Sequence, residues 1–440
     1  MTQPFHECRP YSRQETRTGG FDQAIDLMML LAFIWYLTPV EFIVPIPLLL
    51  GSRLITWLLL LIFSAFAVRL LFRFSSMTRW TVVSLFAFIN MTILGVLRFG
   101  LHFETAVFGN DMLTFFALVA GLIWASTRSQ ARLLSAFRII ATLSTMALVV
   151  TIVGLRIGFI TPMFGEERLS TQSMYTCTFA VASLLPVGLV QPPGERRELS
   201  SARLALFAAG LASVFAAGVL SAGRTVTLQG LGALAVSAVP IFTQRRSKTT
   251  SAILVVGALI GIGAVISVFV ETSTQADLLR ERVVSTSTTD GGRFEELVAL
   301  LDQVSSSLMT GWGFGSLFDS PIPIEEYGLA AAPHIGVFTY LQKGGVLIFG
   351  IFVLVPIYIC FRGLFRSASN TIAYGAAGAL VVYLITGFTS GGWFTVQVFI
   401  FGACLSVATY GKNSTGLRSR NRYTVHAASS FEEVRHEVSL

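Results

Sequence analysis

His334 is the residue of this sequence whose type and place most directly suggest chemistry. It follows Pro333 at one end of a long apolar segment, and the chain contains five histidines in all. We expect Pro333 and His334 to begin a helix, on which Phe338, Leu341 and Gly345 follow at intervals of four, seven and eleven residues. Imidazole ionises near neutrality, so His334 is a candidate general base acting on a hydroxyl group. A purely structural hydrogen bond at the helix start is the alternative.

Two arginines are placed to bind an anion such as a phosphate. Arg224 lies in a short break, residues 221–225, between two apolar runs that are each long enough to cross a membrane. An ionisable group at that depth usually pairs with another residue or lines a path, and a carboxylate partner on a neighbouring helix is the alternative. Arg293 follows two glycines and is expected in the first turn of a helix, where free N–H groups favour anions. Guanidinium groups donate in a planar fork that suits phosphate, so His334, Arg224 and Arg293 are our candidate catalytic residues.

Four further arginines are candidates for binding the same anion from the same side of the membrane. They are Arg53, Arg98, Arg280 and Arg282. Several arginines on one side suit a polyanionic ligand, and a lipid diphosphate would fit them. Arginines near helix ends also extend to lipid headgroups. For Arg53, contact with headgroups is at least as good an explanation as binding of the anion.

Neither the acidic residues nor the cysteines indicate a metal or a cofactor. Glutamate pairs at 166–167, 295–296 and 325–326 are expected to be solvated, and none belongs to an Asp-x-Asp motif. The four cysteines lie far apart and lack ligand spacing. A Gly-x-Ser-x-Gly elbow, a P-loop and a His-Glu-x-x-His motif are all missing, so hydrolase, ATPase and metalloprotease functions have no support. If His334 is not the base, Glu295 or Glu296 is the next candidate.

The elements that must position these residues are apolar segments of membrane-crossing length. Hydrophobic residues make up 53% of the chain, charged residues 12%, and the mean hydropathy is +0.71. A hydrocarbon core of about 30 Å is crossed by about 20 apolar residues, and inside lipid the backbone must bond to itself as a helix. We predict an all-α polytopic membrane protein with about twelve transmembrane helices, at 22–40, 54–72, 80–99, 108–126, 135–158, 172–190, 202–221, 225–242, 251–270, 335–361, 371–389 and 393–410.

Basic residues predict the orientation of these helices. With a cytoplasmic N-terminus, 22 of the 31 Lys and Arg residues fall on the inner side and nine on the outer side, as the positive-inside rule requires. The prediction places tails 1–21 and 411–440 in the cytoplasm, helices one to nine in 22–270, a periplasmic loop at 271–334 and three helices in 335–410. The net charge of +7 is spread over the inner loops, which suits anionic lipid and does not indicate nucleic-acid binding.

The long outer loop is expected to contain an amphipathic helix from Arg293 to Leu308. Its apolar face is predicted to carry Phe294, Leu297, Val298, Leu301, Val304 and Leu308. Thr289 or Asp290 can cap the helix after a turn at the two glycines, 291 and 292. The helix either lies on the membrane surface or forms a lid over a cavity between the transmembrane helices. Sharp turns are expected at Gly311, Gly313 and Gly315.

Three elements in this order resemble the superfamily of lipid-linked polysaccharide polymerases and O-antigen ligases. The first is an arginine in a tight outer turn, Ser221-Ala222-Gly223-Arg224. The second is Gly292-Arg293, followed by an amphipathic helix and the three glycines. The third is His334 with Leu341 and Gly345 behind it. The resemblance covers about residues 200–360, and Ile335 stands where members usually carry Asn.

The resemblance implies a metal-independent membrane glycosyltransferase with a GT-C-like architecture and a site facing the periplasm of a bacterial inner membrane. Its donor and acceptor would be glycans on undecaprenyl diphosphate, polymerised into exopolysaccharide or O-antigen, with a chain-length regulator and a flippase as associated proteins. Arginines would stabilise the diphosphate leaving group, and His334 would act on the acceptor hydroxyl. The alternatives are an O-antigen ligase that transfers the glycan to lipid A core and, in another class, a multi-helix transporter or lipid flippase.

Overall fold

The structure of the chain is a computed structural model. It describes residues 79–98, 103–160, 171–190, 201–221, 223–243, 286–321, 329–330, 332–367, 371–389 and 395–410, together with Leu27 and Gly263. Of the predicted helices, those at 22–40, 54–72 and 251–270 lie outside the described residues, apart from Leu27 and Gly263.

The described chain is almost entirely helical. Its first half contains α3 (Arg79–Leu97), α4 (Thr105–Thr127), α5 (Gln130–Arg156), α6 (Gln172–Gly188), α7 (Ser201–Leu220) and α8 (Arg224–Thr243). Its second half contains α11 (Thr286–Val304), η3 (Ser305–Ser307), β1 (Phe318–Asp319), β2 (Leu329–Ala330), η4 (Gly336–Phe338), α12 (Thr339–Phe349), the π-turn η5 (Gly350–Leu354), α13 (Val355–Arg366), α14 (Ile372–Thr389) and α15 (Thr395–Tyr410). The two strands pair antiparallel, with Phe318 opposite Ala330.

The prediction of an all-α membrane protein is confirmed at this level. Among the described residues, five helical stretches are long and apolar enough to cross a membrane: Arg79–Leu97, Thr105–Thr127, Gln130–Arg156, Gly336–Phe365 and Ile372–Thr389. Three shorter apolar helices accompany them, at Met174–Gly188, Ala205–Leu220 and Thr395–Thr409. The total of twelve spans and the GT-C-like architecture stay predictions.

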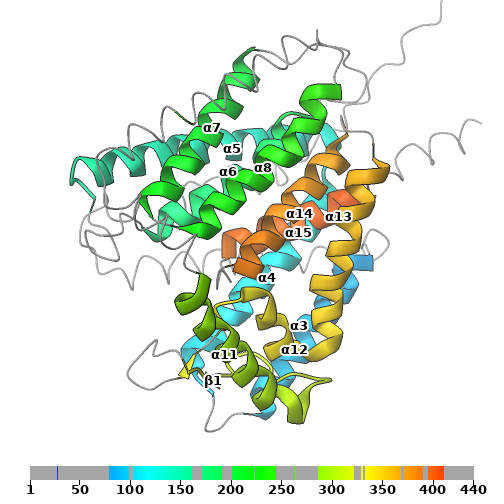
Figure 1. The fold of residues 1–440 in the computed structure, drawn as a ribbon. Helices are drawn as coiled ribbons and strands as arrows, with labels where there is room; N and C mark the ends of the chain where they lie inside the picture. Colours follow the sequence, from blue (N-terminus) through cyan, green and yellow to red (C-terminus); the bar gives the residue numbers. More distant parts are fainter. Residues whose placement is uncertain are drawn as a thin grey trace, which may run out of the picture.

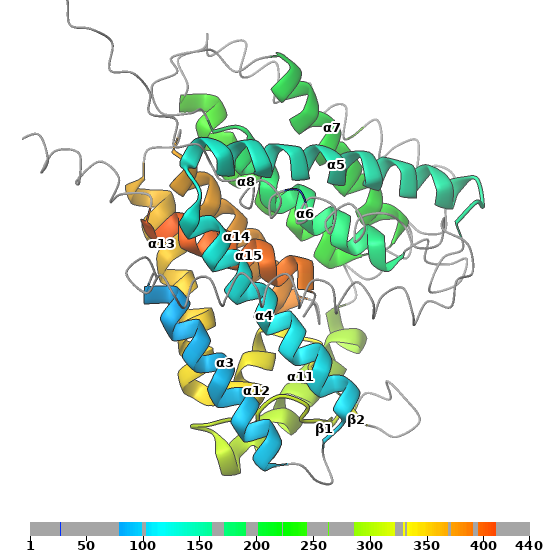
Figure 2. The ribbon, with the colours of Figure 1, turned by 180° about the vertical axis from the view of Figure 1, so that it is seen from behind.

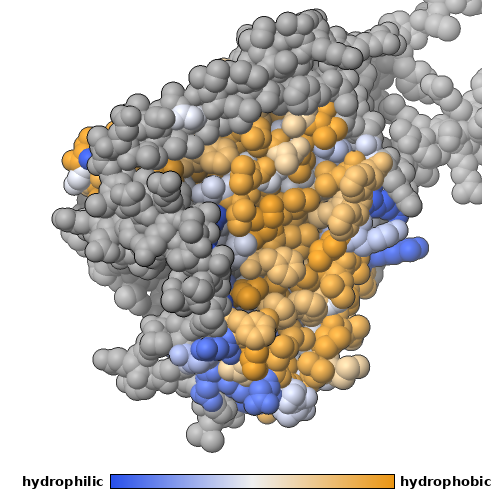
Figure 3. Space-filling model, in the orientation of Figure 1, coloured by the Kyte–Doolittle hydropathy of each residue, from blue (hydrophilic) through white to orange (hydrophobic). Residues whose placement is uncertain are grey.

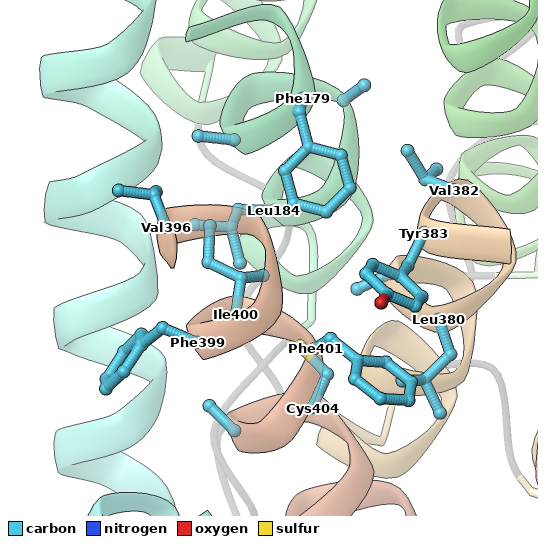
Figure 4. Packing of buried hydrophobic residues seen from close by; sticks show 14 of the residues in the cluster. Phe179, Leu184, Leu380, Val382, Tyr383, Val396, Phe399, Ile400, Phe401 and Cys404 are labelled. Carbon is cyan, nitrogen blue, oxygen red and sulfur yellow. The ribbon is translucent and has the colours of Figure 1, made fainter. Parts of the chain in front are cut away.

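The helices pack around a core built from α4, α6, α14 and α15 (Figures 1 and 2). α4 lies against α15 with the backbones in close approach, because a methyl group at Gly121 would overlap the carbonyl of Phe399 and one at Gly402 would overlap that of Leu118. Small residues at such crossings are a common basis of helix association in membranes. In the core the rings of Tyr383 and Phe401 stack with centroids 4.0 Å apart (Figure 4).

A broad apolar surface covers one side of the molecule. In Figure 3 hydrophobic atoms form a continuous face with hydrophilic atoms at its margins. Large side chains such as Phe86 on α3, Met146 on α5 and Phe361 on α13 are 59–64% exposed. Since soluble proteins rarely leave contiguous apolar patches of this extent uncovered, lipid is the natural solvent for this face.

Contacts between helix ends and loops occur in two separate regions. At one end Arg98 after α3 bonds to Ser307 of η3, and Phe103 before α4 forms a β-bridge with Ser316. At the other end Arg138 of α5 donates to the carbonyls that follow α6. α11, β1 and the start of α12 lie at the first end, drawn at the bottom of Figure 1.

The predicted single helix at 335–361 is wrong in one respect, because it breaks at Gly345. That residue has φ 70° and ψ −172°, outside the helical region. The freed backbone groups bond to the preceding loop: the Trp312 N–H donates to the Gln342 carbonyl at 2.8 Å, and the Val346 N–H donates to the Leu308 carbonyl at 2.8 Å. The face that was expected to run from His334 through Leu341 to Gly345 is therefore not continuous.

The amphipathic helix exists, but its start and its buried face differ from the prediction. α11 begins at Thr286, so Thr289, Asp290 and the two glycines lie inside it and do not cap it or turn the chain into it. Leu300 and Val304 are buried against Phe318 and Ala330, whereas Phe294 is 67% exposed and Val298 49% exposed. The buried face instead contains Glu296, Leu300 and Val304, one helical turn apart.

Candidate functional site

A buried carboxylate holds His334 just before η4. The backbone N–H of His334 donates to Glu296 Oε2 at 2.9 Å, and His334 Nδ1 lies 3.1 Å from both carboxylate oxygens. Ser320 Oγ donates to Glu296 Oε1 at 3.1 Å. Three contacts fix His334 to α11, two of them through the imidazole, while 35% of its side chain stays exposed. The bend at 332–335 ends before η4 begins at Gly336, so His334 precedes the helix that it was expected to begin.

The Glu296 carboxylate is fully buried and ionised. Burial alone raises the pKa of this carboxyl, but the hydrogen bonds and charge of His334, with the Ser320 hydroxyl, outweigh burial and lower the pKa below its usual value of 4.5. A carboxylate in this state accepts hydrogen bonds with both oxygens. The predicted solvated pair at 295–296 is therefore wrong for Glu296 and holds for Glu295, which is exposed.

Arg293 lies one turn before Glu296 on α11 and points in the same general direction. It is the eighth residue of the helix, so the expected position in the first turn is wrong and the helix N-terminus does not act beside it. Its Nη1 donates to the carbonyl of Thr389 at 3.0 Å. Thr389 is the last residue of α14, whose terminal carbonyls carry partial negative charge that favours a cation.

Arg224 is half-buried and begins α8, directly after the turn that follows α7 at Leu220. The tight turn predicted here is confirmed, and the Gly223 N–H closes it by donating to the Gly218 carbonyl at 3.0 Å. The next residue, Thr225, donates its hydroxyl to the Thr389 carbonyl at 2.9 Å. Arg224, and not Arg293, is thus the arginine at a helix N-terminus, where free N–H groups favour anions.

The segments that carry the three candidate catalytic residues are linked near the end of α14. One carbonyl oxygen, that of Thr389, accepts from Thr225 on α8 and from Arg293 on α11. The same face of α11 then carries Glu296, which holds His334. Residues from three distant parts of the sequence therefore surround the end of α14.

Arg98 lies at the opposite end of α11 from this cluster. Its Nη2 donates to Ser307 Oγ at 2.7 Å, beyond the end of α11 at Val304. A helix rises about 1.5 Å per residue, so Arg293 and the end of α11 are separated by about 16 Å. The structure does not bring Arg98 together with Arg293. Arg53, Arg280 and Arg282 lie outside the described residues.

The loop between α11 and β1 packs closely between α3 and α12. Gly311, Gly313 and Gly315 have φ of 68°, 82° and 80°, so the sharp turns predicted at these glycines are confirmed. Side chains here would overlap neighbours: a methyl group at Gly313 would meet the backbone of Gly95, and one at Gly311 would meet that of Gly345. These contacts fix the loop that follows α11, the helix that carries Arg293 and Glu296, against α3 and α12.

A buried ion pair joins α4 to α12 beside this loop. Lys343 Nζ lies 2.9 Å from Asp111 Oδ2, and both side chains are at most 5% exposed. The same Asp111 oxygen accepts from the Gly315 N–H at 2.9 Å, and Lys343 also donates to the Ser316 carbonyl. The predicted topology puts nine basic residues on the outer side, and Lys343 is one of them. Its role in the structure is to bind the glycine loop.

Sequence reasoning missed the pairing of Glu296 with His334 and that of Asp111 with Lys343. For the first, the sequence shows only that Glu296 follows Arg293 by three residues and so shares its helix face. For the second, a lysine in an otherwise apolar helix predicts a buried partner. Within the residues that the structure describes, no three His, Cys, Asp or Glu side chains gather as a metal site would require.

Comparisons with known proteins found no matching family model, no matching curated protein and no matching solved structure. The chemistry that this cluster can perform must therefore be inferred from its geometry. It combines an imidazole held by a buried carboxylate with the Arg293 guanidinium at the end of α14, and Arg224 adjoins Thr225, which bonds to the same helix end. Such a set can take a proton from a hydroxyl and stabilise a neighbouring anion.

Proposed function

We propose that this protein is a metal-independent membrane glycosyltransferase that polymerises lipid-linked glycans. It joins oligosaccharide repeat units carried on undecaprenyl diphosphate into exopolysaccharide or O-antigen. The observation that supports this most is that Arg293 and Thr225, the neighbour of Arg224, both bond to the Thr389 carbonyl, while Glu296 on the helix of Arg293 holds His334. Arg224, Arg293 and His334 carry the sequence resemblance to lipid-linked polysaccharide polymerases.

In the proposed reaction an acceptor sugar hydroxyl attacks the anomeric carbon of the donor glycan. A new glycosidic C–O bond forms while the bond from that carbon to the diphosphate oxygen breaks, and the electron pair leaves with the diphosphate. His334 takes the hydroxyl proton. Arg224 and Arg293 stabilise the charge that develops on the leaving group, as preorganised cations do at a site of limited water access.

Two features of the arginines suit a diphosphate ligand. Arg293 uses one nitrogen, Nη1, on the Thr389 carbonyl, and a guanidinium has five N–H donors in a planar fork. The position of Arg224 at the start of α8 adds the partial positive charge of a helix N-terminus.

The proposal places this cluster on the periplasmic side of a bacterial inner membrane, with both chain termini in the cytoplasm. The excess of basic residues in the opposite loops supports that orientation. The donor lipid would reach the site from the bilayer, and the water-soluble glycan would extend into the periplasm.

The O-antigen ligase alternative shares the donor chemistry and differs in acceptor, which would be lipid A core. A transporter or flippase is favoured by one observation, the break of a membrane helix at Gly345, since broken helices are typical of transporters. Loop residues occupy the backbone groups freed at this break, through Trp312 and Leu308. The break therefore serves as a structural junction and we favour the transferase.

The test is purified protein in nanodiscs supplied with a synthetic lipid-linked repeat unit. A polymerase yields a ladder of longer lipid-linked glycans and releases undecaprenyl diphosphate, with no loss of rate in EDTA. Arg224→Ala and Arg293→Ala should each lower the rate by about 10²–10³-fold. Arg156→Ala, which removes an exposed arginine at the end of α5, is the control and should keep the wild-type rate. Product that forms only when lipid A core is added would favour the ligase, and movement of intact donor without bond cleavage would favour the flippase.

A further inference from the structure

Glu296 contacts His334 more extensively than a chance neighbour would. It accepts the His334 backbone N–H at 2.9 Å and lies 3.1 Å from Nδ1 with each of its oxygens. A carboxylate only accepts hydrogen bonds, so Nδ1 must carry a proton to bond with it. The geometry therefore specifies which ring nitrogen is protonated in the neutral imidazole.

We infer that Glu296 is a positioning residue that holds His334 in the Nδ1–H tautomer and leaves the Nε2 lone pair available to accept a proton. This inference rests on the proposed function, because the proton in question is that of the acceptor hydroxyl. His334 Nε2 makes no hydrogen bond to any residue within the described ranges. With about a third of the side chain exposed, the ring can be reached by a hydroxyl from outside.

Burial makes this arrangement rigid. Glu296 is 0% exposed, and Ser320 Oγ adds a hydrogen bond to the oxygen that also faces Nδ1. The carboxylate is attached to α11, whose Leu300 and Val304 pack against Phe318. Among the described residues, His334 is the ionisable group in contact with Glu296, and Arg293 lies one turn earlier on the same helix. A partner charge that is both buried and anchored fixes the ring orientation as well as its tautomer.

The alternative is that Glu296 only anchors the backbone before η4, through the His334 N–H. The variant Glu296→Gln separates the two roles. Its amide oxygen still accepts the backbone N–H, so the anchor survives. Its NH₂ group donates to Nδ1, which favours the opposite tautomer with the proton on Nε2 and removes the lone pair from the reacting nitrogen. A matched control exists one residue away, because Glu295 is exposed.

The experiment combines ¹⁵N-histidine NMR with turnover, using full-length protein in nanodiscs. The His334 signals are assigned by their loss in His334→Gln. We expect the Nδ1–H tautomer in the wild type and in Glu295→Gln, and the Nε2–H tautomer in Glu296→Gln. Turnover with lipid-linked repeat units should fall about 10²–10⁴-fold in Glu296→Gln with donor affinity unchanged. Glu296→Asp, which keeps the charge at shorter reach, should recover part of the rate.

Each result has a distinct meaning. An unchanged tautomer in Glu296→Gln overturns the inference, as does a changed tautomer with turnover equal to that of Glu295→Gln. Matching circular dichroism spectra and gel-filtration profiles of the two glutamine variants at the assay temperature show that the rate loss is not a loss of folding. If the tautomer changes but the wild type transfers no sugar, the contact is as inferred while the proposed function fails.

Discussion

Arg293 and Thr389 connect the loop helix to the end of a membrane helix: Arg293 Nη1 donates to the Thr389 carbonyl at 3.0 Å. The same carbonyl accepts from Thr225, the residue after Arg224. One oxygen thus sets the relative positions of α8, α11 and α14 at the proposed diphosphate site.

Arg293→Lys should keep the charge but lose most of the activity. Lysine is a point charge without the planar fork, so it cannot hold the Thr389 carbonyl and a phosphate in the same geometry. We expect a fall in rate of about 10-fold to 10²-fold and a weaker donor affinity, measured by titration of lipid-linked donor in nanodiscs. Wild-type rate and affinity in Arg293→Lys would show that the guanidinium contributes only its charge.

Asp111→Asn should destabilise the protein strongly, because it leaves Lys343 buried without its counter-charge. Removing one partner of a buried ion pair costs about 3–5 kcal/mol. The expected result is a lower unfolding temperature in detergent, followed by intrinsic fluorescence.

The double variant Asp111→Asn with Lys343→Met is the informative control. It removes both charges, so it should unfold at a higher temperature than Asp111→Asn alone. A double variant that is less stable by the full sum of the single effects would mean that the two residues do not act as a pair.

Much of the fold follows from hydropathy, because an apolar run of sufficient length can only be a helix in lipid. The turn before Arg224 and the positive φ at Gly313 were predictable from local chemistry alone. The break at Gly345 was not, since glycine inside an apolar run is compatible with a continuous helix. It depends on contacts with a loop that precedes Gly345 in the sequence, at Gly311 and Met309.

The sequence indicated which residues are candidates for the site, but it did not predict the contacts between them. Phe294 and Val298 mark the most apolar face of α11, yet that face is exposed and the buried one carries Glu296. Next to a membrane, the apolar face of a helix need not be the face that packs on protein. Nothing local in the sequence links Glu296 to His334 or Arg293 to Thr389, because these contacts join distant segments.

A cysteine at Ser306 tests the orientation of the molecule. Ser306 is exposed in η3, within the loop 271–334 that is predicted to be periplasmic. With the four native cysteines replaced, Ser306→Cys in intact cells should react with an impermeant maleimide. Reaction only after the inner membrane is opened would place the site in the cytoplasm and contradict the periplasmic assignment.

Acid should remove the stabilising effect of Glu296. Its folded pKa is lowered below 4.5 by His334 and Ser320, which outweigh burial, so its ionised form stabilises the fold above pH 4.5. That contribution is lost as the pH falls through the lowered pKa. The difference in unfolding temperature between wild type and Glu296→Gln should shrink as the pH falls below about 4.5. A difference that keeps growing as the pH falls below 4.5 would mean that the pKa of this carboxyl is not lowered in the folded protein.

The most direct measurement is the fate of lipid-linked repeat units when His334 is changed. His334→Ala and His334→Gln should lower polymer formation by about 10²–10⁴-fold, because the acceptor hydroxyl loses its base. Single lipid-linked units should accumulate in cells, and the purified variants should still bind donor through Arg224 and Arg293. Near wild-type polymer from either variant would contradict the account and leave His334 as a structural residue before η4.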